Sequence, residues 1–238
     1  MEDRIIHFEI EGKKVLGFDT GLSSQAFAQA KLAQFITDTG YIVGPGGGID
    51  VWKPSGVTER NGSMVIWGPA FDGERLDKVI CNQENKDRAL DALRYWIRAR
   101  QLLPQEEQLP YPWPAGAIIS ESNAILFPPD RLVKRSLDAE GAEAWLESAG
   151  RWVHPDLSGE EAAAFAAGAM VYFIFCGIPP FQDGDINRVR ADIREGVFFP
   201  PPAHGSGAGR HPIRPYRGNH CSRRLLRKEE YKKGRQRG

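Results

Sequence analysis

Cysteine and histidine are scarce in this chain of 238 residues, which has three Cys and five His. Cys81, Cys176 and Cys221 are widely separated, and no two of them have the spacing of metal ligands or suggest a disulfide framework. The histidines are equally scattered, so we expect structural or solvent-exposed roles for them. So few cysteines are typical of proteins from reducing compartments, and we expect a cytoplasmic protein.

Long apolar runs are also missing. The N-terminus, Met-Glu-Asp-Arg, is acidic and lacks the apolar stretch of a signal peptide. The longest apolar run, residues 162–176, has only 15 residues, which is short for a bilayer-spanning helix and predicts a buried core helix. We therefore expect no membrane association.

Signatures of several enzyme classes are absent, among them His-Glu-x-x-His, the Walker phosphate loop and the Gly-x-Ser-x-Gly elbow. Residues 44–48, Gly-Pro-Gly-Gly-Gly, invite interpretation as a phosphate-binding loop. They lack the Gly-x-Gly-x-x-Gly spacing, and no predicted helix begins directly after them to favour an anion. We interpret them as a flexible hairpin loop.

Negative charge is nearly missing from the C-terminal tail, residues 203–238. The tail contains 11 Lys and Arg but only two acids, Glu229 and Glu230, so its formal net charge is +9. Because the whole chain has a formal net charge of zero, the preceding residues carry −9. The tail has few core-forming residues, so most of it should be disordered. Three hypotheses remain open: a tail without function, an electrostatic arm for nucleic acid or an acidic partner, and accidental sequence after a lost reading frame.

The first third of the chain has the pattern of a strand-rich region. Alternation of apolar and polar residues predicts a hairpin of residues 4–10 and 13–18 around Glu11-Gly12. A helix should cover residues 21–37, with Ser23 or Ser24 as its N-cap and Gly40 after its end. Further strands are predicted at residues 41–43, 49–52 and 63–67, the last entered through an Asn61-Gly62 turn.

The middle of the chain has the pattern of helices. The helix predicted at residues 85–103 has one apolar stripe, with Arg94, Arg98 and Arg100 largely off it. Four prolines exclude regular structure from residues 104–114, and a hairpin should follow at residues 117–119 and 124–127. Helices are then predicted at residues 139–148, 160–176 and 186–194, with Ser158 and Glu161 forming a capping box for the second. This order predicts an α+β protein.

Residues 172–181 read Tyr-Phe-Ile-Phe-Cys-Gly-Ile-Pro-Pro-Phe. This segment resembles the end of the buried central helix in eukaryotic-like Ser/Thr protein kinases, where a Gly-x-Pro-Pro-Phe turn follows a tyrosine. Pro155 and Asp156 resemble the Ala-Pro-Glu anchor of that family, and residues 64–76 resemble its last small-lobe strand and hinge. The motif positions in this chain are Gly168, Tyr172, Gly177, Pro179, Pro180 and Phe181.

The resemblance implies a protein-kinase-like bilobal α+β fold. Residues 1–72 would form a small strand-rich lobe with one helix, residues 73–202 an incomplete, mainly helical lobe, and residues 203–238 the basic tail. Any bound nucleotide would lie in the cleft near the hinge, against Met64, Ile66, Trp67, Gly68 and Phe71.

The same resemblance implies that the catalytic residues are missing. Residues 109–111, Leu-Pro-Tyr, stand where His-Arg-Asp would be, and Gly116 stands where the metal-binding Asn would be. Tyr111 cannot accept a proton at neutral pH as a carboxylate does. Asp130 is the only carboxylate near the expected Asp-Phe-Gly, and we interpret it as a solvated loop residue.

The remaining charged parts are incomplete as well. Lys13 or Lys14 could supply the small-lobe lysine, but residues 21–37 contain no Asp or Glu to pair with it, and Ala163 replaces the central-helix Asp. Losing several preorganised charges removes most of the electrostatic stabilisation of phosphate transfer. We therefore predict a truncated pseudokinase-type scaffold with an unidentified protein partner, and with no catalytic residue, metal or cofactor. Two alternatives remain: an atypical ATP- and Mg-binding Ser/Thr kinase, and a nucleic-acid-associated protein acting through its tail.

Overall fold

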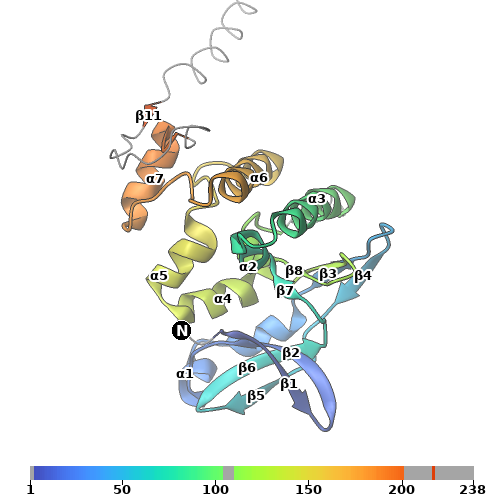
Figure 1. Ribbon diagram of the computed structural model, residues 1–238. Helices are drawn as coiled ribbons and strands as arrows, with labels where there is room; N and C mark the ends of the chain where they lie inside the picture. The colour runs from blue at the N-terminus through green and yellow to red at the C-terminus, as the bar shows by residue number, and fades with distance from the viewer. Residues whose placement is uncertain (1–2, 104–109, 201–215, 218–238) are drawn as a thin grey trace, which may run out of the picture.

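The computed structural model describes residues 3–103, 110–200 and 216–217. It is a mixed α+β fold with two main antiparallel sheets and several helices, as the sequence predicted. In Figure 1 the first sheet lies at one end of the molecule, the helices α3 (Lys86–Leu102) and α6 (Gly159–Cys176) lie at the other, and the second sheet lies between them.

The first sheet has the strand order β1-β2-β6-β5. Strands β1 (Ile5–Ile10) and β2 (Lys13–Asp19) form the predicted hairpin, and both turn residues, Glu11 and Gly12, have positive φ. This pair of left-handed residues suits the twist of a two-residue hairpin. The Asn61-Gly62 turn joins β6 (Ser63–Pro69) to β5 (Gly56–Arg60), a strand that the sequence analysis missed.

The prediction of a single helix at residues 21–37 is wrong, because the helix is interrupted at Lys31. Helix α1 (Ser24–Gln29) begins after Ser23, whose hydroxyl accepts a hydrogen bond from the Ala26 N–H, and the 3₁₀ segment η1 (Leu32–Thr37) follows. Lys31 between them has a left-handed φ of 55°. Phe27 and Leu32 are both buried, yet five residues would place them on nearly opposite sides of one continuous helix. The break lets both face the core.

The second sheet has the strand order β4-β3-β9-β8-β7. Strands β3 (Gly40–Val43) and β4 (Ile49–Trp52) form a hairpin whose loop is closed by a 2.8 Å hydrogen bond from the Gly44 N–H to the Gly48 carbonyl, so the hairpin interpretation of residues 44–48 is confirmed. The predicted hairpin of β8 (Ile118–Ile119) and β9 (Ile125–Phe127) is present. β3 pairs with β9, and β7 (Glu74–Arg75) pairs with β8, so this sheet joins segments from both sides of residue 72.

Helices before and after the second hairpin differ in part from the prediction. α3 begins after Asn85, which caps it, as predicted from the apolar stripe. The short α2 (Leu76–Cys81) was missed. Helix α4 (Asp130–Glu140), helix α5 (Ala142–Trp145) and the π-helical turn η3 (Leu146–Gly150) replace the predicted helix of residues 139–148. The 3₁₀ turn η2 (Pro114–Gly116) precedes β8.

Helix α6 begins after Ser158, but the Ser158 side chain makes no capping hydrogen bond, so the predicted capping box is wrong. Gly177, with a φ of 73°, ends the helix as predicted. By length and composition α6 is also the one described helix that could cross a membrane, although the core helix of a soluble protein passes the same test. Its inner face is buried through Ala162, Ala166, Ala169, Met170 and Ile174.

Beyond α6, the predicted helix α7 (Ile186–Glu195) is capped by Asp185 and closed by Gly196. Strand β10 (Val197–Phe198) then pairs with β11 (Tyr216–Arg217), the only described part of the basic tail. The predicted disorder of the tail lies otherwise outside the described residues. The main hydrophobic core is continuous from Ile5 in β1 through Trp96 in α3 to Ile174 in α6, and a small second cluster lies beneath α7.

Candidate functional site

The region where a kinase-like chain would hold its catalytic base lies between α3 and β8. Leu109, with residues 104–108, is outside the described residues, but Pro110 and Tyr111 are described. The peptide group that joins Pro110 to Tyr111 is held on both sides. Arg100 Nη1 donates to the Pro110 carbonyl at 2.6 Å, and the Tyr111 N–H donates to Asp130 Oδ2 at 2.9 Å. A cation and a carboxylate thus position this segment of backbone.

Asp130 is not the solvated loop residue predicted from the sequence. It is the first residue of α4, and its Oδ1 is buried without a hydrogen-bond partner among the described residues. Burial raises the pKa of Asp130 to about 6, although the Tyr111 N–H and Arg100 each favour the charged form. The residue is therefore a carboxyl group that titrates near neutrality, with one oxygen committed to the backbone.

Arg100 also differs from the prediction, which placed it largely off the apolar stripe of α3. Its side chain is only 6% exposed, and its guanidinium lies 5.2 Å from the centre of the Trp96 ring. Burial lowers the pKa of Arg100 to about 10, with Asp130 acting in the opposite direction. Helical spacing could have predicted this, because Arg100 lies four residues after Trp96 and seven after Leu93, on the face of α3 that carries the apolar stripe.

Tyr111 is 41% exposed and lies edge-on to Trp113, with ring centroids 5.0 Å apart. Burial of part of the phenol raises the pKa of Tyr111; Arg190 lowers it and Asp130 raises it further. The phenol therefore stays protonated at neutral pH and cannot serve there as a base.

Gly116, which the resemblance aligns with a metal-binding Asn, lies against an aromatic ring. A Cβ atom on Gly116 would overlap Cδ1 and Nε1 of Trp113, so a glycine is required at this close approach. The Trp113 indole is buried, and its Nε1 has no hydrogen-bond partner in the described part of the chain. A larger side chain at residue 116 would have to displace this ring.

Neither of the two lysines that the resemblance offers as a small-lobe lysine lies in the interior. Lys13 and Lys14 are exposed at the turn end of the β1–β2 hairpin, opposite Ile10 and Glu9. Ala163, at the position of the central-helix Asp, is half-buried on α6. Residues 3–103 and 110–200 contain no group of three or more His, Cys, Asp or Glu arranged to hold a metal ion.

The residues predicted to border a nucleotide cleft lie along β6 and the connector after it. Ile66 is fully buried, and a side chain on Gly68 would overlap the Trp52 ring. Three carbonyl groups of this stretch already accept hydrogen bonds from within the chain. Trp52 Nε1 donates to Pro69 at 2.9 Å, the Ser55 N–H donates to Trp67 at 2.7 Å, and His7 Nε2 lies 2.9 Å from the Phe71 oxygen.

Met64 and Trp67 are partly exposed and Phe71 is buried, so the five predicted cleft residues do not share one open surface. A pocket of about 670 Å³ begins just after them, at Asp72, Gly73 and Glu74, and none of the five lines it. Its other walls come from α2, the start of α3 and the β8–β9 hairpin.

Some of the motif positions of residues 155–181 contact α7 or the segment after it. Asp156, after Pro155, forms a two-pronged ion pair with Arg194 of α7, with distances of 2.7 and 3.0 Å. The Arg194 hydrogen bond lowers the pKa of Asp156. The Tyr172 hydroxyl donates to the Phe199 carbonyl at 2.5 Å, while Gly168 is exposed on α6.

The turn of residues 177–181 is fixed by a buried arginine that the sequence analysis missed. Arg151 Nη1 donates to the carbonyls of Phe181 and Asp183 at 2.7 and 2.8 Å, while Nε and Nη2 bind Glu147. Phe181 stacks on Phe165, with centroids 6.0 Å apart, and Pro179 and Pro180 lead into this contact. All three nitrogens of the Arg151 guanidinium thus donate hydrogen bonds to two backbone carbonyls and one carboxylate, which indicates a structural role.

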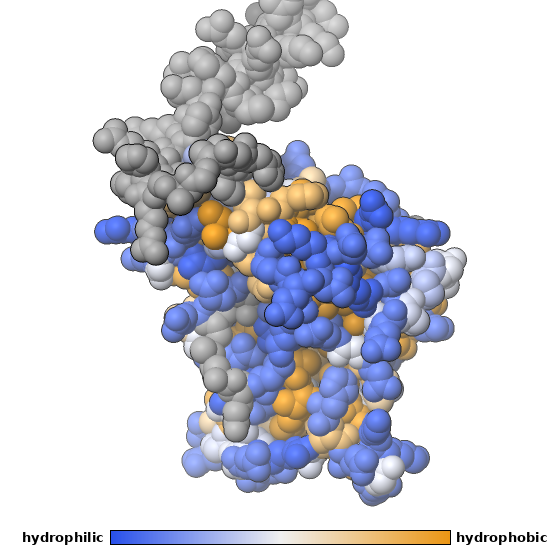
Figure 2. Space-filling model, in the orientation of Figure 1, coloured by the Kyte–Doolittle hydropathy of each residue, from blue (hydrophilic) through white to orange (hydrophobic). Residues whose placement is uncertain are grey.

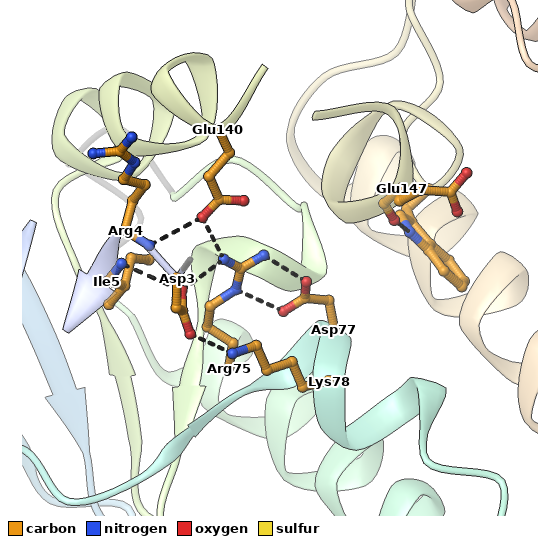
Figure 3. Close-up of polar contacts among 9 residues, drawn as sticks. Asp3, Arg4, Ile5, Arg75, Asp77, Lys78, Glu140 and Glu147 are labelled. Carbon is orange, nitrogen blue, oxygen red and sulfur yellow. Dashed lines mark hydrogen bonds and ion pairs between the residues drawn. The ribbon is translucent and has the colours of Figure 1, made fainter. Parts of the chain in front are cut away.

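A second polar cluster surrounds Arg75, at the junction of β7 and α2 (Figure 3). Arg75 forms a two-pronged pair with Asp77 at 2.7 and 3.0 Å, and Nη1 lies 3.1 Å from Glu140 Oε1 and 3.4 Å from Asp3 Oδ1. Lys78 also binds Asp3. Burial alone would lower the pKa of Arg75, but Asp77, then Glu140 and Asp3, raise it. The cluster joins the N-terminal segment, α2 and the end of α4.

Neither a search of protein-family models nor a search of curated proteins finds a match to this chain.

Proposed function

We propose that this chain is a protein-kinase-like domain, bilobal in arrangement, that transfers no phosphate and acts as an interaction or scaffold protein. The observation that carries the proposal is the clamped peptide group of Pro110 and Tyr111. Phosphate transfer depends on charges that are free to meet the nucleophile and the metal. Here Arg100 and Asp130 are both engaged in holding backbone.

Two further observations support the loss of activity. The Trp113 ring fills the space that a metal-binding side chain at residue 116 would need. The carbonyl groups of Trp67, Pro69 and Phe71, in the stretch interpreted as the hinge, are occupied by donors from the chain itself. A purine that bound there would have to compete with these internal hydrogen bonds.

The test is a thermal-shift titration of the full chain with ATP and ADP, each with and without Mg²⁺, beside an assay for phosphate incorporation from labelled ATP. A ligand at 100 times its dissociation constant adds about 2.7 kcal/mol of stability, which is an easily measured shift. We expect no shift and no incorporation. A shift that requires both ATP and Mg²⁺, accompanied by labelling of the chain, would overturn the proposal.

Asp130 favours the alternative of an atypical ATP-binding kinase, because a pKa of about 6 and an oxygen without a partner in the described residues suit a general base. The Asp130→Asn variant decides between the two. The matched control is Asp138→Asn, which removes a carboxylate that pairs with Lys134 further along the same helix. If labelling is seen and only Asp130→Asn abolishes it, the kinase alternative holds.

A further inference from the structure

Helix α6 has two apolar faces, but only one is covered. Its inner face packs into the core, whereas Ala164, Gly168, Val171 and Phe175 are exposed. Phe175 is 63% exposed and Val171 39%. Figure 2 shows apolar side chains gathered over α6 at the end of the molecule opposite the first sheet. A helix that is apolar all round is normally buried on all sides, so we expect the outer face of α6 to be covered by a binding partner.

The four exposed residues form a single stripe, because their spacing of four, three and four residues is that of a coiled-coil seam. The stripe is asymmetric in size: its first half has Ala164 and Gly168, and its second half has Val171 and Phe175. Apart from its chain neighbours and the backbone of its own helix, no described atom lies within 4 Å of the position that a Cβ on Gly168 would occupy, so the small half leaves open space at the surface.

A groove of about 460 Å³ adjoins the small half of this stripe. It lies between α3 and α6 and is lined by Ala164, Ala167, Trp96 and Ile97, with Arg100 and Glu160 among its polar residues. An aromatic side chain entering from outside would meet alanine methyl groups on one wall and the Trp96–Ile97 segment on the other.

We propose that this face is a homodimer interface, in which α6 packs antiparallel against α6 of a second copy across a two-fold axis. In such a pair, Ala164 faces Phe175 of the partner and Gly168 faces its Val171. Both pairs are centred on the same point of the helix, midway between residues 169 and 170. One register therefore matches every small residue with a large one, and Phe175 of each copy enters the α3–α6 groove of the other.

The self-matching of the stripe is what selects a second copy over other occupants. A two-fold interface requires a surface that is complementary to itself, so that residue i meets j and j meets i. A bilayer surface makes no use of a stripe whose small half matches its large half. The antiparallel arrangement also places Glu161, at the start of α6, beyond the apolar contact and near solvent, while Glu160 is a polar residue of the groove.

The first test is the molar mass of the full chain by light scattering and sedimentation velocity over a range of concentrations. We expect a dimer that dissociates on dilution. Phe175→Asp and Gly168→Leu should each shift the dissociation at least tenfold toward the monomer, the first by charge and the second by bulk. Val51→Asp is the matched control, since Val51 is a 58% exposed apolar residue of β4, and it should leave the dimer unchanged. Circular dichroism confirms that each variant is folded.

The second test fixes the register. With the three native cysteines replaced by serine, a mixture of Ala164→Cys and Phe175→Cys chains should form an intermolecular disulfide under mild oxidation. Either variant alone should not, because equal positions lie roughly 16 Å apart along an antiparallel pair at 1.5 Å per residue. Crosslinking of each variant with itself but not of the mixture would exclude this register.

Other occupants give different results, and each of them overturns the proposal. A chain that stays monomeric at its highest soluble concentration has no such interface. A monomer that sediments with lipid vesicles, and loses this with Phe175→Asp, uses the face for membranes. A chain that dimerises only after residues 203–238 are removed has the face covered by its own tail. A dimer that Phe175→Asp and Gly168→Leu leave intact forms through another surface.

Discussion

Arg75 and Arg100 are both 6% exposed and burial lowers the pKa of both, yet their pKa values shift in opposite directions because their charged neighbours differ. Arg75 is surrounded by Asp77, Glu140 and Asp3, and its pKa is raised. Arg100 has a backbone carbonyl as its hydrogen-bond acceptor and Asp130 as a charged neighbour, and its pKa falls to about 10. Carboxylates in direct contact outweigh the cost of desolvating a guanidinium, whereas one neutral acceptor and a carboxylate that binds elsewhere do not.

The comparison separates two kinds of buried charge. The Arg75 cluster joins three distant segments, and its carboxylates all pair with the Arg75 guanidinium. This is the pattern of a structural ion network. The Arg100–Asp130 region holds a single peptide group and retains a carboxyl oxygen without a partner in the described residues. Under the proposed function this second region is what remains of a catalytic centre, now used to position backbone.

The largest expected effect comes from breaking the Arg75 cluster. Arg75→Met should lower the free energy of unfolding by about 3–5 kcal/mol, because the carboxylates of Asp77 and Glu140 would stay buried without their cation. Urea denaturation measures this. The control is Arg94→Met, which breaks the exposed pair with Asp91 and should cost about 0.5 kcal/mol or less. Equal costs for the two variants would refute the structural assignment of Arg75.

Arg100→Met should cost less, about 1–2 kcal/mol, by the same measurement. The variant loses the hydrogen bond to Pro110 but also removes a poorly compensated buried charge, and methionine keeps much of the packing against Trp96. If Arg100→Met lowered the free energy of unfolding as much as Arg75→Met does, the buried charge of Arg100 would have to be better balanced by its neighbours than its lowered pKa indicates.

Asp130 should make stability depend on pH in an unusual direction. Its folded pKa, about 6, lies above the usual value of 3.8, so the folded chain binds more protons between these values than the unfolded chain does. The contribution of this group to stability is therefore greatest below pH 4 and declines as pH rises to about 6. In Asp130→Asn this decline, on the order of 2–3 kcal/mol, should disappear from urea titrations between pH 4 and 7. An unchanged slope in the variant would assign the titration to another group.

Local signals in the sequence predicted much of the fold correctly. The Glu11-Gly12 turn, the helix α3 and its end-to-end pattern of apolar residues, and the stop at Gly177 depend on residues close together in the sequence; the turn, the helix and the stop were confirmed. Two segments were missed for local reasons too. Helix α2 is only six residues long, and α4 follows directly on Pro128-Pro129, which were interpreted as loop. The spacing of Leu132, Val133, Ser136 and Leu137 was the available signal for α4.

The candidate site was harder to predict, because its contacts join residues far apart in the chain. The carboxylate Asp130 meets a backbone N–H 19 residues earlier, and Arg75 meets Glu140 65 residues later. Nothing in the order of residues states which side chain will fill the space beside Gly116. The absence of acids at residues 110 and 111 and the place of Arg100 on the apolar stripe of α3 could be read from the sequence, whereas the burial of Asp130 could not.

The smallest expected effect comes from the pair that matches Arg75–Asp77 in geometry but not in burial. Arg194 holds Asp156 with the same two-pronged arrangement, yet both side chains are about half exposed. Water solvates both partners in the unfolded and folded chain, so little is gained by pairing them. Arg194→Met should leave the melting temperature within the scatter of replicate scans at low and at high salt. A clear, salt-sensitive drop would show that two-pronged geometry stabilises this fold without burial, and the contrast between Arg75 and Arg100 would then need another explanation.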